Sequence, residues 1–225
     1  MTHDHKDGHG HHHDHSHGHD HDHDHEHDHH HHHDHSHDWH SKDYVARWMA
    51  RDAGRAGERR EILAALIAAA PFGSGAAIGV LDVGGGNGVV TEAILEAFPK
   101  ARVTLIDYSE EMLAQARARF ASSGREVRYV RGDLLDPDWP RAAGGPFDLA
   151  VSAIAIHNLQ NLAAMAACYE AVHGLLKPGG CFLDYDHFDK FGGVPLHQHS
   201  LRVAGFVSVE PVWHRHPTAV LKAVR

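Results

Sequence analysis

Apolar and polar positions along this chain predict strands and helices in regular alternation. Short apolar runs that end in glycine or in a charged residue predict buried strands, whereas apolar residues spaced three and four apart predict helices. The predicted strands are 78–83, 102–106, 127–131, 147–152, 181–188, 207–213 and 218–224, and the predicted helices are 41–70, 89–98, 110–120, 161–176 and 196–206. This alternation is typical of an α/β domain.

The first helical stretch, 41–70, carries signals for its start and for an interruption. Ser41 stands at a helix N-cap position, and Gly54 and Gly57 predict a break near 53–57. Beyond the break, a second apolar stripe is expected to pack on the sheet.

Residues 1–40 differ sharply in composition from the rest of the chain. They contain 21 of the 28 histidines, and no apolar residue stands between Met1 and Trp39. Such a segment has nothing to bury, so we expect it to be disordered. We therefore divide the chain into a tail, 1–40, and one α/β domain, 41–225, in which the helices of 41–70 precede a sheet core at 78–225.

Charge follows the same division. The tail holds ten acidic residues and one lysine, a net charge of −9, whereas the remaining 20 basic and 20 acidic residues cancel. A neutral body argues against a nucleic-acid partner, which would require a basic stripe. No apolar run approaches the roughly 18 residues of a membrane span, and the polar N-terminus is not a signal peptide. Cys168 and Cys181 fall in apolar patterns, so we expect reduced core thiols and a cytoplasmic protein.

The tail suggests capture of transition-metal ions. Neutral imidazole is a common ligand of Zn, Ni, Cu and Co, and neighbouring aspartates attract cations. The segment resembles the His-rich tails of bacterial metal-handling proteins, which implies exchangeable binding that protonation reverses below a pH of roughly 6.5. An engineered tag and a functionless solvated tail are the alternatives. The candidate ligands are His11, His12, His13, His19, His21, His23, His25, His29, His30, His31, His32 and His33.

The stretch Val80–Gly88, with the sequence VLDVGGGNG, joins the first predicted sheet strand to a helix through a glycine-rich loop. Glycine lets the backbone turn sharply and lets a ligand approach it closely. The dinucleotide fingerprint G-x-G-x-x-G fails, because its third glycine would fall on Val89 or Thr91. A nicotinamide-dependent oxidoreductase is therefore disfavoured.

The pattern that is present, D-x-G-x-G-x-G, resembles motif I of the class I S-adenosylmethionine (SAM) methyltransferases. It comprises Asp82, Gly84, Gly86 and Gly88, with Gly85 between them. The LKPGG sequence before the fifth strand of the sheet is a second feature of these enzymes. The resemblance implies a Rossmann-like, mostly parallel seven-stranded sheet, flanked by helices, with an antiparallel hairpin at the C-terminus.

The resemblance also implies roles for residues that follow successive strands. Asp107, at the end of the second strand, would bind the ribose hydroxyls, since Ser109 is better placed to cap the next helix. Tyr108 would lie near the adenine. Asp133 follows the third strand and would bind the adenine amino group beside the Leu134 backbone. The backbone of Ser152 and Ala153 would face the amino-acid end of SAM.

The segment SAIAIHNLQN after the fourth strand bears on the methyl acceptor. It lacks the [DNS]-P-P-[YFW] motif of amide and adenine N-methyltransferases and resembles the ubiquinone/menaquinone-methyltransferase-like small-molecule group. His157 would then be a base toward a hydroxyl or thiol, or a structural histidine bonded to backbone. The resemblance makes Tyr44 and Trp48 candidates for the pocket wall, with core packing as the alternative. His187, at a strand end, is a further candidate for substrate contact.

Two functions remain open on the sequence. The first is SAM-dependent methyl transfer to an unidentified small molecule. The second is metal buffering or delivery, with the SAM fold as a scaffold or sensor. Further histidines at 197, 199, 214 and 216 match no metal motif, and solvated or packed side chains are expected there.

Overall fold

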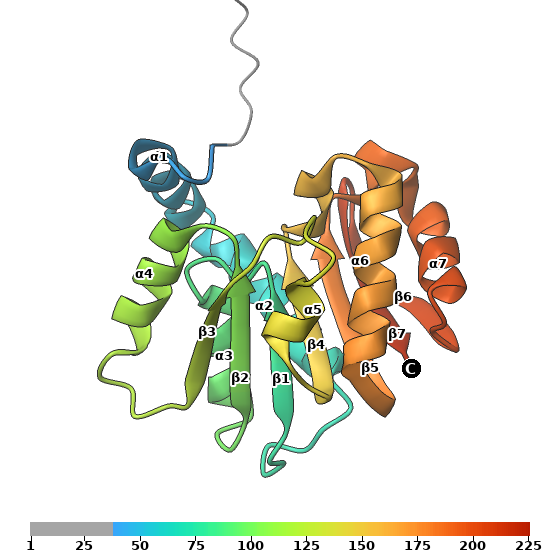
Figure 1. Ribbon diagram of the computed structural model, residues 1–225, viewed down its shortest axis with the longest axis horizontal. Helices are drawn as coiled ribbons and strands as arrows, with labels where there is room; N and C mark the ends of the chain where they lie inside the picture. The colour runs from blue at the N-terminus through green and yellow to red at the C-terminus, as the bar shows by residue number, and fades with distance from the viewer. Residues whose placement is uncertain (1–37) are drawn as a thin grey trace, which may run out of the picture. The chain divides into compact units, whose positions relative to one another are not determined.

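The computed structural model describes residues 38–225, which form a seven-stranded sheet with helices on both faces (Figure 1). The strand order is β3-β2-β1-β4-β5-β7-β6; the pairs β5–β7 and β6–β7 are antiparallel and the other four are parallel. The predicted class of sheet, including its antiparallel C-terminal hairpin, is confirmed. The strands are β1 (Gly79–Val83), β2 (Arg102–Asp107), β3 (Val127–Arg131), β4 (Phe147–Ala153), β5 (Leu176–Asp186), β6 (Ser208–Arg215) and β7 (Thr218–Val224).

The helices follow the predicted periods, with differences at their ends. They are α1 (Lys42–Ala53), α2 (Ala56–Ala69), α3 (Val89–Ala97), α4 (Glu110–Phe120), α5 (Trp139–Ala143), α6 (Leu162–Leu175) and α7 (Gly193–Val203). The predicted break separates α1 from α2. Ser41 caps α1 as expected, because the Tyr44 backbone N–H donates to the Ser41 Oγ at 3.3 Å.

Three short elements were not predicted: α5 and the 3₁₀ turns η1 (Ile156–Leu159) and η2 (Phe188–Phe191). Each is too short to show a hydrophobic period, and buried side chains such as Trp139 and Phe188 hold them in place. The connection after β5 is partly folded, since η2 occupies it and α7 begins at Gly193 rather than at the predicted 196.

The fifth strand begins earlier than predicted. Leu176 pairs with Phe147 of β4, and a register shift between Phe147 and Leu149 accommodates the following Pro-Gly-Gly within the strand. A bulge of this kind keeps the ladder intact across residues that otherwise end a strand. The sequence 177–180 is therefore part of β5 and not a separate turn.

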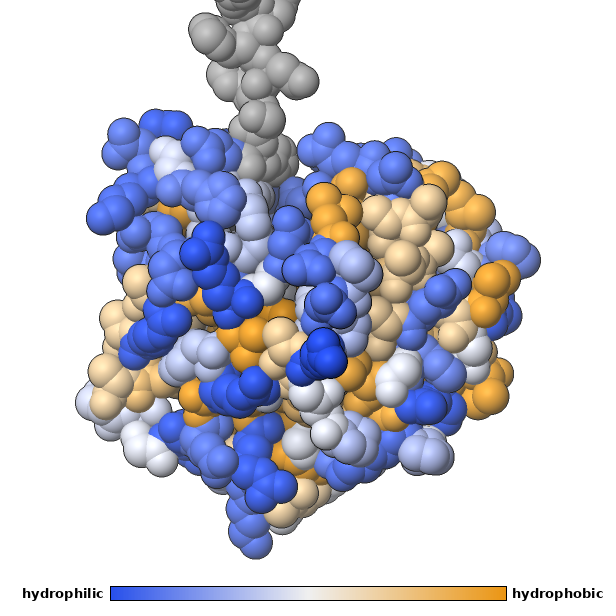
Figure 2. All heavy atoms as spheres, viewed as in Figure 1, coloured by the Kyte–Doolittle hydropathy of each residue, from blue (hydrophilic) through white to orange (hydrophobic). Residues whose placement is uncertain are grey.

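Alternating residues of the strands bury opposite faces of the sheet. The face carrying Val80 and Val103 packs against α2 and α3, while the face carrying Leu81, Ala150 and Phe182 packs against α5, α6 and α7 (Figure 1). Figure 2 shows a mostly hydrophilic surface with a hydrophobic stretch along α6. That helix has the sequence LAAMAACYEAVHGL, so alanines make up much of its outer side, while Met165, Cys168, Tyr169 and Val172 face the core.

Both cysteines are buried and free, as expected for core residues. Burial raises the pKa of the Cys168 thiol far above its ordinary value and that of Cys181 to about 11. Neither thiol is therefore a thiolate nucleophile near neutral pH. Among the helices in residues 38–225, none has the length and apolar character that crossing a bilayer requires.

Candidate cofactor and acceptor site

The centre of the sheet contains a switch in strand order. From β1 the sheet continues to β2 and β3 on one side and to β4 and β5 on the other. In open α/β sheets, ligands bind in the crevice outside the carboxyl ends of the strands at such a point. The loops after β1 and β4 meet here, because a Cβ on Gly84 would lie 2.5 Å from the Cβ of Ala155.

The glycine loop between β1 and α3 adopts backbone conformations that require glycine. The φ angles of Gly84, Gly86 and Gly88 are +64°, +53° and +81°. A Cβ on Gly86 would meet only the Met112 sulfur, at 4.0 Å, so this part of the loop presents bare backbone to open space. The loop can therefore admit a ligand against its main chain.

Asp82 lies beneath the loop and does not reach its outer surface. The side chain is fully buried, and its Oδ2 accepts a hydrogen bond from the Thr91 hydroxyl of α3 at 2.6 Å. Burial, reinforced by the Asp107 charge, raises the pKa of Asp82 to about 7 although the Thr91 hydrogen bond opposes the rise. The structure thus gives this predicted binding residue a supporting position, where it ties β1 to α3.

Asp107 links the ends of β1, β2 and α4. Its Oδ2 accepts the Gly86 N–H at 2.9 Å and its Oδ1 accepts the Ser109 N–H at 2.8 Å. Burial raises its pKa, and these backbone N–H groups oppose that rise. Ser109 caps α4, as expected, by accepting the Met112 N–H at 3.2 Å. Each Asp107 oxygen keeps a second lone pair, so the carboxylate can accept from two adjacent hydroxyls.

Tyr108 and Asp133 lie at the same corner of the sheet. Burial raises the pKa of the half-buried Tyr108, and the charges of Asp38, Asp133 and Asp107 raise it further. Asp133 is exposed, and its Oδ1 accepts the Leu135 N–H at 2.9 Å, which fixes the turn after β3. Leu134 is partly buried against the core. The structure therefore brings together Asp107, Tyr108 and Asp133, as the sequence predicted.

The end of β4 carries backbone strain. Ile154 has φ +54°, which is unusual for a β-branched residue, and its N–H donates to the Tyr185 carbonyl at 2.8 Å. Strained residues gather at functional sites, where surrounding contacts hold them. Ser152, two residues earlier, is fully buried, and its hydroxyl has no partner among residues 38–225. Ala153 remains partly exposed beside the crevice.

His157 lies on η1, directly after this strained turn, and contacts the carboxylate of Asp186. The sequence analysis did not identify Asp186 as a site residue. The Nδ1 of His157 is 2.6 Å from Asp186 Oδ1, a close polar contact that does not meet the geometric criteria of a regular hydrogen bond. The backbone N–H groups of His157 and His187 also donate to Asp186, at 2.9 and 2.7 Å. Asp186 is 2% exposed and therefore fixes both histidines from within the fold.

His187 completes this cluster. Its ring lies edge-on to that of His157, with centroids 5.3 Å apart. Burial is the main cause that lowers the pKa of His187, and the neighbouring His157 lowers it further. His187 is therefore neutral near pH 7. The sequence signal for Asp186 was the alternation in CFLDYDHF, which places Asp184 and Asp186 on the same face of β5.

A second group of buried polar side chains, linked by hydrogen bonds, lies behind His157 and His187. Asp184 Oδ2 accepts from the Tyr169 hydroxyl at 3.3 Å, and that hydroxyl lies 2.9 Å from Nδ1 of His197. Burial raises the pKa of Asp184 well above its usual range and lowers that of His197. These groups join β5, α6 and α7 behind the histidine cluster.

Tyr44 and Trp48 lie away from His157. Both rings contact Trp39, with centroids 5.1 and 5.4 Å apart, and α1 packs against α4 (Figure 1). The two histidines instead follow β4 and β5. Through Trp39, Tyr44 and Trp48 lie beside the turn that carries Tyr108 and Ser109, and their role in a pocket wall stays a prediction.

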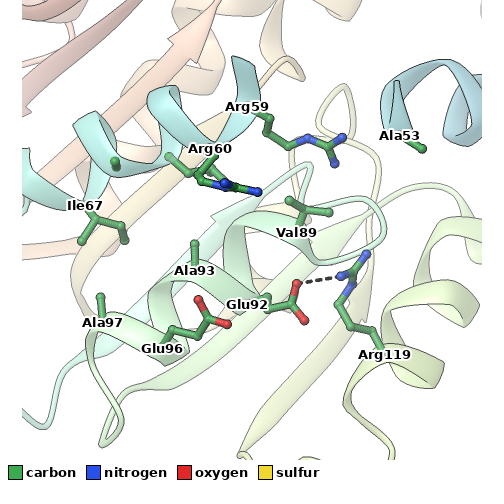
Figure 3. Close-up of a pocket in the computed structure, with 12 residues that line it drawn as sticks. Ala53, Arg59, Arg60, Ile67, Val89, Glu92, Ala93, Glu96, Ala97 and Arg119 are labelled. Carbon is green, nitrogen blue, oxygen red and sulfur yellow. Dashed lines mark hydrogen bonds and ion pairs between the residues drawn. The ribbon is translucent and has the colours of Figure 1, made fainter. Parts of the chain in front are cut away.

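A separate hollow of about 760 Å³ lies between α2 and α3 (Figure 3). Arginines and glutamates alternate with small apolar residues around it. Arg119 donates to Glu92 at 2.7 Å and to the Asn87 carbonyl of the glycine loop at 2.9 Å. None of the sequence-predicted site residues lines the hollow. Arg119, which does line it, stabilises the glycine loop through its hydrogen bond to the Asn87 carbonyl.

The metal predictions have different outcomes in the two parts of the chain. The twelve tail histidines lie outside the described residues. Within residues 38–225, no group of three or more His, Cys, Asp or Glu side chains is arranged to hold a metal ion. The C-terminal histidines behave as expected for packed or solvated residues: His197 is buried, and His199 and His214 are exposed.

Comparisons with known proteins agree with this geometry. A sequence profile described as a methyltransferase domain matches residues 80–180. The chain is 44% identical over 73 residues to a release factor glutamine methyltransferase of Deinococcus radiodurans. The alignment covers 32% of this chain and 24% of that protein. It is 38% identical over 103 residues to a ubiquinone biosynthesis O-methyltransferase of Azotobacter vinelandii, covering 45% of this chain and 40% of that protein.

A solved structure shows the same fold with a product of SAM bound. The N-methyltransferase NodS from Bradyrhizobium japonicum, in complex with S-adenosylhomocysteine (SAH), superposes with a TM-score of 0.59 at 20% identity. The alignment covers 74% of this chain and 86% of NodS. The chain spans less than half the length of the two sequence relatives. The substrates of those relatives are therefore not assigned to this chain. Residues 80–180 therefore match a methyltransferase domain, and residues 38–225 share the fold of a solved methyltransferase structure.

Proposed function

We propose that this protein transfers the methyl group of SAM to a hydroxyl or thiol of a small-molecule acceptor. The observation that carries the proposal is the convergence of Gly86, Asp107 and Asp133 from the ends of β1, β2 and β3 on one corner of the crevice.

The chemistry of the residues at this corner supports SAM as the ligand. Gly86 presents main chain to open space, whereas Gly84 packs against Ala155, where an added Cβ would collide. Asp107 has free lone pairs for the two ribose hydroxyls, and its backbone contacts fix their direction. Tyr108 offers an aromatic face to the adenine, with Asp133 and the Leu134 backbone at its edge. Ser152 and Ala153 border the amino-acid end, while Asp82 holds the loop from beneath.

When bound, SAM supplies a methyl group that its sulfonium charge activates toward nucleophiles. The protein's main contribution is then to hold the acceptor at a near-attack distance and angle. The His157 Nδ1 faces Asp186, which leaves Nε2 to accept the acceptor's proton as the new bond forms. Asp186 fixes the ring and stabilises the imidazolium. Neutral His187, beside it, provides a polar contact for the acceptor.

A hydroxyl or thiol acceptor follows from this base. Such groups carry a proton at neutral pH and become better nucleophiles as it leaves, so a positioned histidine accelerates their methylation. The relatives described above include both O- and N-methyltransferases, so they do not decide which atom is methylated. The segment 152–158 has the sequence SAIAIHN, so it provides no Pro-Pro pair for an amide or a nucleobase.

Isothermal titration calorimetry of the full chain tests the proposal. SAM and SAH should bind at micromolar concentrations, and NADH should not bind. Acceptor libraries of phenols, carboxylic acids, thiols and amines can then be screened for SAH release. If neither SAM nor NADH binds, the methyltransferase proposal is refuted.

We also propose that the tail binds divalent transition-metal ions, on the strength of its 21 histidines in 40 residues. Zn²⁺ or Ni²⁺ titrations at pH 7.5 and 5.5 should show several exchangeable ions at the higher pH and a large loss at the lower. If metal binds while neither SAM nor any acceptor does, metal buffering becomes the better description of the protein.

A further inference from the structure

Residues 38–40, which connect the tail to α1, lie against the turn that follows β2. The Ser109 hydroxyl donates to the Trp39 carbonyl oxygen at 2.5 Å. The His40 ring contacts the Tyr108 ring, with centroids 4.3 Å apart and planes inclined by 66°. Because Ser109 is fully buried, its hydrogen bond fastens the chain to the inside of this turn. We call residues 38–40 the strap.

The strap is held on its other side by α1. The Ser41 N–H donates to the Asp38 carbonyl at 3.0 Å, and the His40 N–H donates to Asp38 Oδ1 at 3.2 Å. The Trp39 ring packs edge-on against Tyr44 and Trp48 of α1. The short segment is therefore folded into a turn with fixed side-chain directions, and it is not a loose extension of the tail.

Tyr108 is the point at which the strap meets the corner that holds Asp107 and Asp133. Asp38 of the strap and both of these carboxylates act electrostatically on the Tyr108 hydroxyl. Ring contact from His40 limits the orientations that Tyr108 can adopt. A ring held in one orientation presents a prepared face for stacking, so less entropy is lost when a planar base binds.

We propose that the strap is part of the cofactor site, where His40 orients Tyr108 against the adenine and Trp39 holds the strap over the nucleoside end. This inference rests on the SAM binding proposed above. Its consequence is that residues 38–40 belong to the folded domain together with α1.

The test compares SAH binding to full-length variants by calorimetry. H40A removes the ring contact, H40F retains an aromatic ring, and H199A removes an exposed histidine of α7 as a matched control. H40A should weaken SAH binding by about three- to tenfold, in line with the loss of one aromatic contact. H40F should restore most of the affinity, and H199A should bind SAH as the unmodified protein does.

Hydrogen–deuterium exchange gives a second measurement that does not depend on a variant. Saturating SAH should slow exchange of the backbone amides in the peptide that spans residues 38–48. SAH affinity in H40A equal to that of the unmodified protein, or strap exchange that SAH does not change, would overturn the inference while leaving the methyltransferase proposal intact. Failure of the unmodified protein to bind SAH would overturn both.

Discussion

At the scale of single residues, the same side chain type has different roles according to burial. Asp82, Asp107, Asp133 and Asp186 all follow or end strands near one edge of the sheet, yet they differ in exposure and partners. Exposed Asp133 and partly buried Asp107 can meet a ligand. Buried Asp82 and Asp186 hold other groups in place. Each role has its own measurable consequence.

Replacing Asp107 by Ala should weaken SAH binding by about 2–3 kcal/mol, because two hydrogen bonds from ribose hydroxyls to a carboxylate are lost. Calorimetry gives the dissociation constant directly. In steady-state kinetics the KM for SAM should rise more than kcat falls. A D107A variant with unchanged SAM kinetics would contradict the ribose assignment.

Replacing His157 by Gln should lower kcat for a hydroxyl acceptor by about 10²- to 10⁴-fold, the usual contribution of a general base. SAH affinity should stay the same, because the residue faces the acceptor side. D186N should produce a smaller loss in kcat and should alter the pH–rate profile, since it acts through His157. A purely structural histidine would instead change stability and leave the pH profile unaltered.

The pKa of Asp82 predicts how stability depends on pH. The folded value of about 7 lies above the value near 3.9 of an unfolded aspartate, so the native state binds the proton more tightly. This group's stabilisation is fully present below pH 4 and is lost as the pH rises toward 7, by a total of about 4 kcal/mol. An Asn at this position cannot ionise. Urea unfolding of D82N should therefore show a shallower fall in stability from pH 4 to 7 than the unmodified protein, and parallel curves would contradict the assignment.

At the scale of elements, the site depends on loops that meet across the switch in strand order. The glycine loop after β1 contacts the turn after β4, and Asp107 of β2 and Arg119 of α4 brace the same loop. Backbone geometry in one loop therefore limits which residues the other can carry.

A Gly84→Ala variant should be destabilised by about 2–4 kcal/mol and should bind SAH poorly. The added Cβ meets Ala155 at 2.5 Å, and φ +64° is unfavourable for alanine. Gly75→Ala is the matched control, because nothing lies within 4 Å of its added Cβ. Urea unfolding measures both variants, and equal stability of the two would show that the loops do not pack as described.

At the scale of the whole molecule, cofactor binding should be visible as stabilisation of residues 38–225 as a unit. SAH at 100 times its dissociation constant should add about 2.7 kcal/mol to the free energy of unfolding. For a domain of this size, that corresponds to a rise in Tm of about 5–10 °C. Calorimetric melting with SAH, and with NADH as a control, measures it. A Tm that rises equally with both ligands would contradict a SAM-specific site.

The sequence by itself determined the longer strands and helices and the grouping of Asp107 with Asp133 at one edge of the sheet. Strand and helix periods are local, as are glycine turns and N-caps such as Ser41 and Ser109. Parallel strands bring their carboxyl ends to one edge, so Asp107 and Asp133 could be placed together once the strands were predicted.

Only the tertiary structure decided which side chains turn inward and which distant segments meet. The direction of Asp82 toward Thr91 depends on how α3 packs against β1, and the contact of Asp186 with His157 joins residues 29 apart in sequence. Tyr44 and Trp48 lie with Trp39 beside the turn after β2 because α1 packs against α4. The strap required the same information, because Ser109 and Trp39 are 70 residues apart. Local hydrophobic periodicity does not predict such contacts, because they depend on which side chains are buried and on the geometry of the assembled sheet.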